Sequence, residues 1–382
     1  MGSARSLSSQ IRPCDLLNAE CKILRLLLFY DVLIKDNSAF AARALYTKLS
    51  TSFIHLSTGR HVAMQITDDN LSAAIYRALR RVRHLKASDP RDKIFGILGL
   101  CSAFGSLLPK PDYSMTESDV FCEVARALIL HSQSLQILAE ANEETSLVGH
   151  PSWVPHWSIP AIVGLPTESA RCYNASRNSN AEFEISSNNK ELWVAGKGID
   201  VVEKTSLASS TAYDFGASDW QRIAGWQASC SLGLSLTEYP TGEPVREALW
   251  RTLCWNVAKT DQYPAPADKK VIFEEWYRVL TADEEPKRTS RELEAHRRFN
   301  ELVRSRRAPL CITEKGFLAS APYTTEVGDR IVVLSGARLP FVLRPVEDHY
   351  KLIGPCYVHG AGIMDGEAFP ENPEELEWFS IW

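Results

Sequence analysis

The sequence has little that would carry the chain across a membrane. The apolar run ILRLLLFYDVLI (23–34) is shorter than the roughly 20 residues of a membrane span and contains Arg25 and Asp31. The opening residues MGSARS match the pattern for myristoylation at Gly2. That short pattern also arises by chance, and a single acyl chain anchors a protein only weakly. We therefore expect no stable membrane span.

An excess of positive charge is also lacking. The 382 residues carry a formal net charge of −5, whereas nucleic-acid-binding domains usually present a basic surface. One local basic cluster is interpreted as an exposed helix face; it consists of Arg77, Arg80, Arg81 and Arg83. No nucleic-acid partner is expected.

Paired cysteines are missing as well. The nine cysteines are odd in number, and no two of them form a C-x-x-C motif. The nine histidines do not stand at metal-ligand spacing to them. We therefore expect reduced thiols, no metal site and a cytoplasmic location.

The common sequence signatures of enzymes are absent, including the P-loop, the G-x-S-x-G elbow and the H-E-x-x-H motif. GKGIDV (196–201) begins like a dinucleotide fingerprint but lacks the third glycine, so it is interpreted as a turn at a strand end. HGAG (359–362) resembles the oxyanion loop of lipase-like hydrolases, but too few residues follow it to hold a serine elbow. These absences predict a protein that works without a metal, nucleotide or flavin cofactor.

Helical patterns dominate the first 150 residues. The apolar residues of LSAAIYRALRRV (71–82) recur at helical spacing, and Pro90 marks the end of this helical stretch. A second helix is predicted after Thr116, which has the spacing of a capping box with Asp119. Residues 1–150 are therefore predicted to form a helical region.

The rest of the chain mixes helices and strands. ELWVAGKGIDVVEK (191–204) alternates like a strand, and the ranges 213–260 and 290–307 have helical patterns. Short apolar runs punctuated by glycine and proline follow from residue 308. The predicted fold class is α+β, with a mixed region of linker and helices over 151–307 and a small antiparallel sheet or barrel-like part over 308–382.

The segment HPSWVPHWSIP (150–160) joins the two halves. Pro151 and Pro155 exclude a regular helix and favour an extended, polyproline-like path. We call residues 150–160 the strap, because such a segment can press its two indoles onto the helical part while connecting it to the strands. Trp153 and Trp157 are predicted to be buried.

Six blocks of the sequence come in an order typical of one family: SDPRDKIFGILGL, PDYS, PSWVPHWS, GDRIVVLSGARLPFVLRP, YKLIGPCYVHG and IMDGEAF. Over roughly residues 70–370 the chain resembles fungal heterokaryon-incompatibility (HET) family proteins. The resemblance is to the region downstream of the HET core, since residues 1–70 lack the aromatic–tryptophan–glycine motif that opens that core. YVHGAGIMDGEA departs from the family pattern, because Ala361 and Gly362 look inserted.

The resemblance implies two alternative functions. One is a regulatory or cell-death protein that acts through protein contacts. The other is a HET-related scaffold recruited into fungal secondary metabolism as a cofactor-independent cyclase of the Diels–Alderase type. Such an enzyme folds an apolar terpenoid or polyene substrate and activates it with a hydrogen bond. We favour the cyclase here, because the chain is short, lacks the core and contains ten tryptophans.

If the chain is a cyclase, polar groups beside aromatic residues are its candidate site. The predicted catalytic donors are His156, Tyr113, Arg344 and Tyr357. The predicted substrate-binding residues are Trp153, Trp157 and His359. Each has a structural alternative, since an arginine such as Arg344 can pair with a carboxylate and a tryptophan can fill a core.

Overall fold

A computed structural model of the protein describes residues 70–83, 85–99, 102–141, 149–159, 172–206, 219–258, 262–281, 298–299, 309–360 and 362–382. The chain divides into two compact units, Met1–Gln65 and Ile66–Trp382, and every described residue belongs to the second. The predictions made for Gly2, for the run 23–34 and for a missing core in residues 1–70 lie outside the described residues. So does most of the helix predicted over 290–307.

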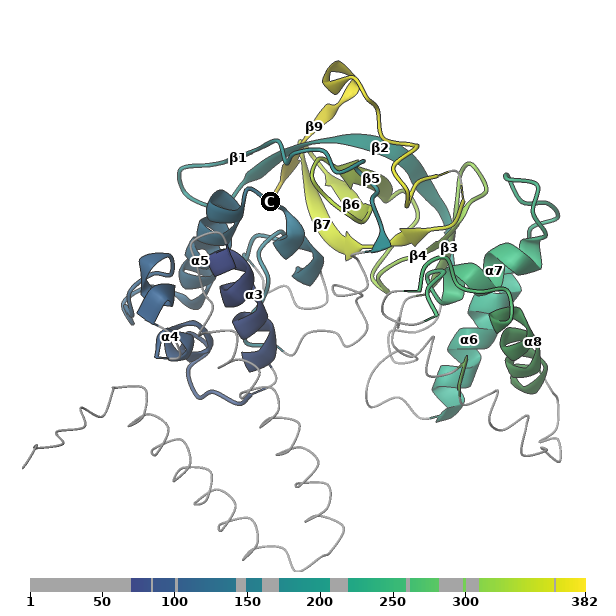
Figure 1. Cartoon of the computed structure of the whole chain (residues 1–382), viewed down its shortest axis with the longest axis horizontal. Coiled ribbons are helices and arrows are strands. Elements are labelled where there is room, and N and C mark those ends of the chain that lie inside the picture. Colours follow the sequence, from purple (N-terminus) through teal and green to yellow (C-terminus); the bar gives the residue numbers. More distant parts are fainter. Residues whose placement is uncertain are drawn as a thin grey trace, which may run out of the picture. The chain divides into compact units, whose positions relative to one another are not determined.

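The first described part is helical, as predicted. It contains α3 (Leu71–Val82), α4 (Asp92–Leu98) and α5 (Glu117–Ser132), with short 3-10 turns η2 (Ser102–Ser106) and η3 (Gln136–Glu140). Thr116 caps α5, and its hydroxyl accepts a hydrogen bond from the backbone N–H of Asp119. Figure 1 shows α3, α4 and α5 gathered into one group.

A nine-stranded sheet forms the second part. Its strands are β1 (Phe183–Ile185), β2 (Leu192–Thr205), β3 (Leu310–Thr313), β4 (Leu318–Ser320), β5 (Arg330–Leu334), β6 (Phe341–Val346), β7 (His349–Pro355), β8 (Tyr357–Val358) and β9 (Glu377–Ile381). The small antiparallel sheet or barrel-like part predicted over 308–382 differs from this sheet in two respects. β1 and β2 come from the earlier region, and β7 pairs with β9 in parallel, so the sheet is mixed.

The long strand β2 organises this sheet. It pairs along its length with β1, β9, β5 and β3, and the pairings β2–β5–β6–β7–β9–β2 form a closed circuit. GKGIDV lies inside β2, so its interpretation as a strand-end turn was wrong. Its glycines allow close approach between strands, because a Cβ at Gly196 would lie 2.8 Å from the carbonyl oxygen of Val333.

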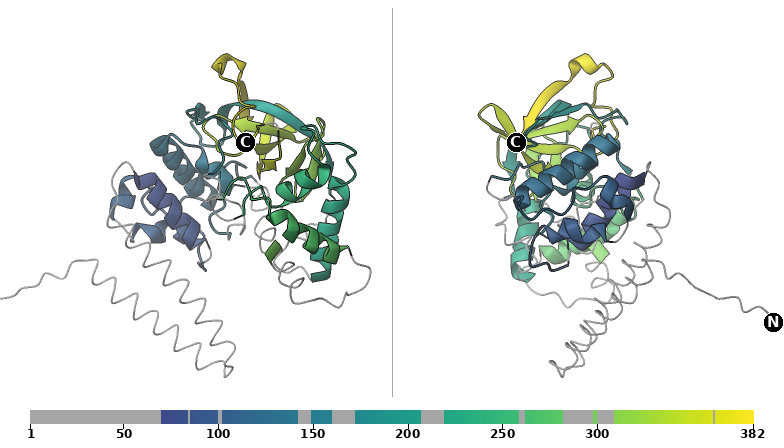
Figure 2. Two further views of the ribbon diagram at one scale, coloured as in Figure 1. Left: turned by 45° about the vertical axis from the view of Figure 1, so that its right-hand side comes forward. Right: turned by 90° about the vertical axis from the view of Figure 1, so that its left-hand side faces the viewer.

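A second helical group packs beside β3 and β4. It contains α6 (Asp219–Gly233), α7 (Val245–Leu253) and α8 (Lys269–Leu280), and Figures 1 and 2 show these helices side by side. Leu249 and Trp250 of α7 share one apolar core with Leu310 and Leu318 of the strands. The fold is therefore α+β, with one helical group before β1 in the sequence and the other between β2 and β3.

Candidate functional site

The strap takes a different path from the one predicted, although its tryptophans are buried. Two successive turns shape it, closed by hydrogen bonds from Val154 N to Pro151 O (3.1 Å) and from Ile159 N to His156 O (3.2 Å). The expected extended path was therefore wrong. Trp153 and Trp157 are fully buried, which confirms the prediction of burial.

Hydrogen bonds attach the strap to both parts of the fold. On the strand side, the Ser152 hydroxyl donates to the carbonyl oxygen of Trp382 (2.6 Å) and accepts from the backbone N–H of Leu352 (2.8 Å). On the helix side, His150 Nδ1 lies 2.9 Å from the hydroxyl of Ser118 in α5. The strap therefore joins helices to strands, as predicted.

Arg83 is hydrogen-bonded to the strap, and the exposed position predicted for it was wrong. We expected it on an exposed helix face, but its side chain is only 1% exposed. It donates to the carbonyl oxygens of Ile159 (2.9 Å) and His156 (3.2 Å) and pairs with Glu140 at 3.0 Å. Its guanidinium carbon also lies 5.5 Å from the ring centroid of Trp157.

The burial of Arg83 had a signal in the sequence. Arg83 continues the four-residue spacing of Leu71, Ile75 and Leu79, so it lies on the buried stripe of the helix and not opposite to it. Burial lowers the pKa of Arg83, whereas the Glu140 carboxylate raises it. Nothing in the sequence around Glu140 indicated that it would pair with Arg83, because the two residues are far apart in the chain and η3 brings Glu140 to Arg83.

Two buried histidines face each other on the strap. The ring centroids of His150 and His156 are 6.0 Å apart. Burial lowers the pKa of His150 to about 4 and also lowers the pKa of His156, while the Glu117 carboxylate, 3.6 Å from His156 Nε2, opposes that shift. His156 Nδ1 contacts the Ser158 hydroxyl (2.8 Å), and its Nε2 has no hydrogen-bond partner among the described residues. The predicted donor His156 is thus an uncharged side chain inside the protein.

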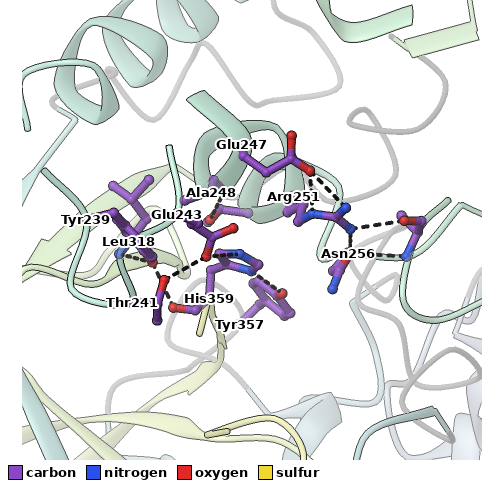
Figure 3. A network of polar contacts seen from close by, with 12 residues as sticks. Tyr239, Thr241, Glu243, Glu247, Ala248, Arg251, Asn256, Leu318, Tyr357 and His359 are labelled. Carbon is purple, nitrogen blue, oxygen red and sulfur yellow. Dashed lines mark hydrogen bonds and ion pairs between the residues drawn. The ribbon is translucent and has the colours of Figure 1, made fainter. Parts of the chain in front are cut away.

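A second polar cluster lies where β8 ends, and Figure 3 shows it. Glu243, in the loop before α7, lies 3.1 Å from His359 Nε2, and the Tyr357 hydroxyl lies 2.9 Å from His359 Nδ1. Because a carboxylate only accepts hydrogen bonds, the proton of a neutral His359 belongs on Nε2, and the Tyr357 hydroxyl donates to Nδ1. The hydrogen bond from His359 lowers the pKa of Glu243.

The same cluster is tied to the strands by a second tyrosine. The Tyr239 hydroxyl donates to the carbonyl oxygen of His359 (2.7 Å) and accepts from the backbone N–H of Leu318 (3.1 Å). Tyr357 stacks on His359 and on Trp255, with ring centroids 6.1 and 5.9 Å apart. We call Glu243, His359, Tyr357 and Tyr239 the β8 cluster. Burial raises the pKa of Tyr357 well above its usual value, so its hydroxyl keeps its proton.

Polar contacts link Tyr357, His359 and Glu243 one after another in the β8 cluster. Tyr357 and His359 are buried, and Glu243 is the most exposed of the three side chains. Sequence reasoning found Tyr357 and His359 but missed Glu243, which lies in a turn without any motif. The arrangement ties three distant segments together and keeps the phenol away from solvent.

The two remaining predicted donors lie in separate surroundings. Tyr113 is half exposed, and its hydroxyl donates to Asp92 at 2.6 Å. Arg344 donates from Nε to Asp329 at 2.9 Å and also pairs with Glu326 at 3.1 Å. The structural alternative considered for Arg344, pairing with a carboxylate, is therefore what the structure contains.

The described residues also hold an open depression of about 470 Å³ near α8. Its lining is largely charged and includes none of the predicted site residues; it consists of Arg246, Glu274, Glu275, Tyr277, Arg278 and Thr281. Within the described ranges, histidine, cysteine, aspartate and glutamate form no group that could hold a metal ion. No helix among those residues is long and apolar enough to cross a membrane.

Comparison with known proteins gives two matches. The Het-6 beta-barrel domain family matches residues 273–381, which include β3 to β9. Heterokaryon incompatibility protein 6, OR allele, of Neurospora crassa is 26% identical over 345 residues, covering 73% of this chain and 49% of the relative. The chain thus spans about half the length of that curated relative, and no solved structure matches. Together the two matches support a relationship with the heterokaryon-incompatibility family.

Proposed function

We propose that this chain, with its similarity to heterokaryon-incompatibility proteins, is a non-enzymatic regulatory protein that acts through contacts with other proteins. The Neurospora relative is named for heterokaryon incompatibility, and the matched domain contains most strands of the sheet. The proposal includes a cytoplasmic location. Its physical argument is the free state of Cys122, Cys172, Cys230, Cys254, Cys311 and Cys356.

The observation that carries this proposal is the internal bonding of the groups that a cyclase would use. A catalytic donor must come within hydrogen-bond reach of the substrate. Tyr357 instead donates to His359, and both side chains are buried. The indoles of Trp153 and Trp157, predicted as walls of a pocket, are fully buried as well. These contacts favour a role in stability for all four side chains.

The alternative is the cyclase, with an apolar terpenoid or polyene substrate and no cofactor. It requires the strap or the end of β8 to move so that a substrate reaches Tyr357 and His359. The depression beside α8 does not suit such a substrate, because most of its lining residues are charged. The cyclase therefore has less support from the described geometry than the regulatory function.

One pair of assays on the same variants separates the two functions. The chain is expressed from an inducible promoter in a filamentous fungus, and growth and death of fused cells are measured. In parallel, purified chelator-treated protein is incubated with extracts that contain linear or diene precursors, and product ratios are compared with the uncatalysed reaction. Tyr357→Phe removes the buried hydroxyl, and Tyr350→Phe is the matched control, since the Tyr350 hydroxyl accepts a hydrogen bond from Arg330, outside the β8 cluster.

The regulatory proposal predicts growth arrest with the unaltered chain and with both folded variants, and unchanged product ratios throughout. Thermal unfolding establishes beforehand that each variant is folded. A product ratio that changes with the unaltered protein and returns to the uncatalysed value with Tyr357→Phe would favour the cyclase. Normal growth and survival with the unaltered chain would contradict the regulatory function.

A further inference from the structure

Three exposed tryptophans lie on one face of β2 and β9. Trp193 is 41% exposed, Trp378 49% and Trp382 44%, whereas most apolar side chains of these strands are buried. Trp193 lies directly opposite Ser380 in the antiparallel ladder. Trp378 and Trp382 stand two residues before and after Ser380, and the N–H of Trp382 donates to the carbonyl oxygen of Tyr350 in β7 (3.0 Å).

Strand geometry places the three indoles together. Side chains at positions two apart along a strand share a face, and directly opposed residues share it too. The three indoles therefore surround Ser380 on one surface of the neighbouring strands β2 and β9, which Figure 1 labels. We call Trp193, Trp378 and Trp382 the indole face. Single exposed apolar residues are ordinary, but a contiguous group of large ones marks an interaction site.

Exposed carboxylates lie near two of the indoles. Glu184 of β1 lies opposite Trp193 in the ladder and is exposed. His349 contacts the Trp382 ring (centroids 6.1 Å apart) and neighbours Asp348, whose side chain is 97% exposed.

Two further groups of carboxylates add to this charge. Glu374 and Glu375 are exposed shortly before Trp378, in the turn η7 (Pro373–Glu375). Glu191 shares the face of Trp193 and accepts a hydrogen bond from the Ser380 hydroxyl (2.5 Å).

The cations along the same stretch of β2 do not balance these carboxylates. Lys190 is already paired with Asp119 at 3.2 Å, and Lys197 is half-buried. On the β7 side, Lys351 follows Tyr350, which pairs with β9, and Lys351 is half-buried too. The rim of the indole face is therefore acidic. An aromatic face with an acidic rim complements arginine, whose guanidinium stacks on indole rings and pairs with carboxylates through parallel hydrogen bonds.

We propose that the indole face is a docking surface for an arginine-rich segment of a partner protein. The segment lies across β2 and β9 with alternate arginines stacked on the indoles and paired with the acidic rim, because an extended chain presents every second side chain to one side. This inference rests on the proposed regulatory function and deepens it, since it names the surface and the chemistry of the partner.

The test measures binding to the whole chain. The probe is a short fluorescein-labelled peptide with arginine at every second position, and its control has the uncharged isostere citrulline at those positions. Fluorescence anisotropy follows binding to the unaltered protein, to the triple variant W193A/W378A/W382A and to Glu184→Lys. Matched controls are Val327→Ala, an exposed apolar residue elsewhere, and Glu238→Lys, an exposed carboxylate outside the face.

We expect the arginine peptide to bind the unaltered protein and the citrulline peptide to bind at least about tenfold more weakly. The triple variant and Glu184→Lys should each weaken binding by about tenfold, while the two controls leave it unchanged. Equal binding of the two peptides would overturn the inference. So would sedimentation that shows a dimer lost in the triple variant, because a second copy of the chain would then occupy the face.

The fungal growth assay separates this inference from the function on which it rests. If the unaltered chain arrests growth and the folded triple variant does so equally, the docking surface is wrong and the regulatory function stands. If the unaltered chain has no effect on growth while arginine-specific binding is lost in the triple variant, the docking surface stands and the regulatory function is wrong. If the unaltered chain arrests growth and binds the arginine peptide, and the folded triple variant does neither, the docking surface and the regulatory function are both supported.

Discussion

At the scale of single residues, the helical part buries the carboxylate of Glu140, and a buried charge needs partners that offset the loss of its hydration. Arg83 lies 3.0 Å from one oxygen, while Arg80 and the Tyr76 hydroxyl lie 2.8 and 3.0 Å from the other. Burial and the Glu140 charge raise the pKa of Tyr76, so its hydroxyl stays protonated and donates. These ion pairs and the hydrogen bond from Tyr76 offset the free-energy cost of burying the Glu140 charge.

Glu140→Gln should strongly destabilise the protein, because it leaves the buried Arg83 without a counter-charge. Breaking a buried ion pair in this way costs about 3–5 kcal/mol, and urea unfolding measures it. The matched control is Glu371→Gln, which breaks the exposed pair with Arg177 (2.7 Å). That change should cost at most about 1 kcal/mol. Equal losses in the two variants would contradict the structural role of Glu140.

At the scale of elements, the strap connects helices to strands. Its Ser152 bonds to two backbone groups of the strand part, and His150 reaches Ser118 of α5. The strap carries two histidines that are buried without charge. This makes the connection between the two parts sensitive to acid.

The stability of the protein should fall as the pH falls, and His150 should account for much of the change. Unfolded His150 binds a proton below its ordinary pKa of 6.5, whereas the folded state keeps it neutral down to about 4. In that window the unfolded state binds more protons, so the free energy of unfolding decreases, by about 2 kcal/mol at about pH 5. Nearby His156 and Lys190 lower the pKa of His150 further, and its bond to Val154 O opposes them.

Urea unfolding at about pH 7 and about pH 5 tests this prediction. His150→Gln, which cannot gain the proton, should flatten the dependence, while the contribution of His156, whose pKa burial also lowers, should remain. His349→Gln is the control, because His349 is partly exposed beside Trp382 and lies outside the strap. An unchanged slope in His150→Gln would contradict the assignment.

At the scale of the whole described unit, β2 completes the sheet from outside the matched domain. The Het-6 domain match begins at residue 273, whereas β2 spans Leu192–Thr205 and pairs with β3, β5 and β9. Leu192 and Val194 are fully buried there. Without β2, the circuit of strands opens and three strands lose a neighbour, which exposes unpaired backbone groups.

A fragment of residues 273–382 should therefore fail to fold alone, while a fragment of residues 66–382 should fold. The shorter fragment lacks β2 but keeps β3 to β9. Circular dichroism during heating measures the difference, because a folded unit of this size unfolds cooperatively. A cooperative transition in the shorter fragment would contradict the central position given to β2.

What the sequence determined by itself is local. Helical spacing and the Thr116 cap predicted α3 and α5, alternation predicted β2, and the prolines around Trp153 marked a segment that buries its indoles without being a helix. These features depend on dihedral preferences and periodicity within a few residues, so a short window contains the information.

Only the tertiary structure decided which polar groups meet. It buried Arg83 against Glu140, brought Glu243 to His359 and enclosed the Tyr357 hydroxyl that had been predicted to act on a substrate. It also brought β2 into a sheet made largely of later strands. These outcomes depend on contacts between segments far apart in the chain. The energy of a charge or hydroxyl is set by the partners and the solvent exclusion that such contacts create, and no local pattern specifies either.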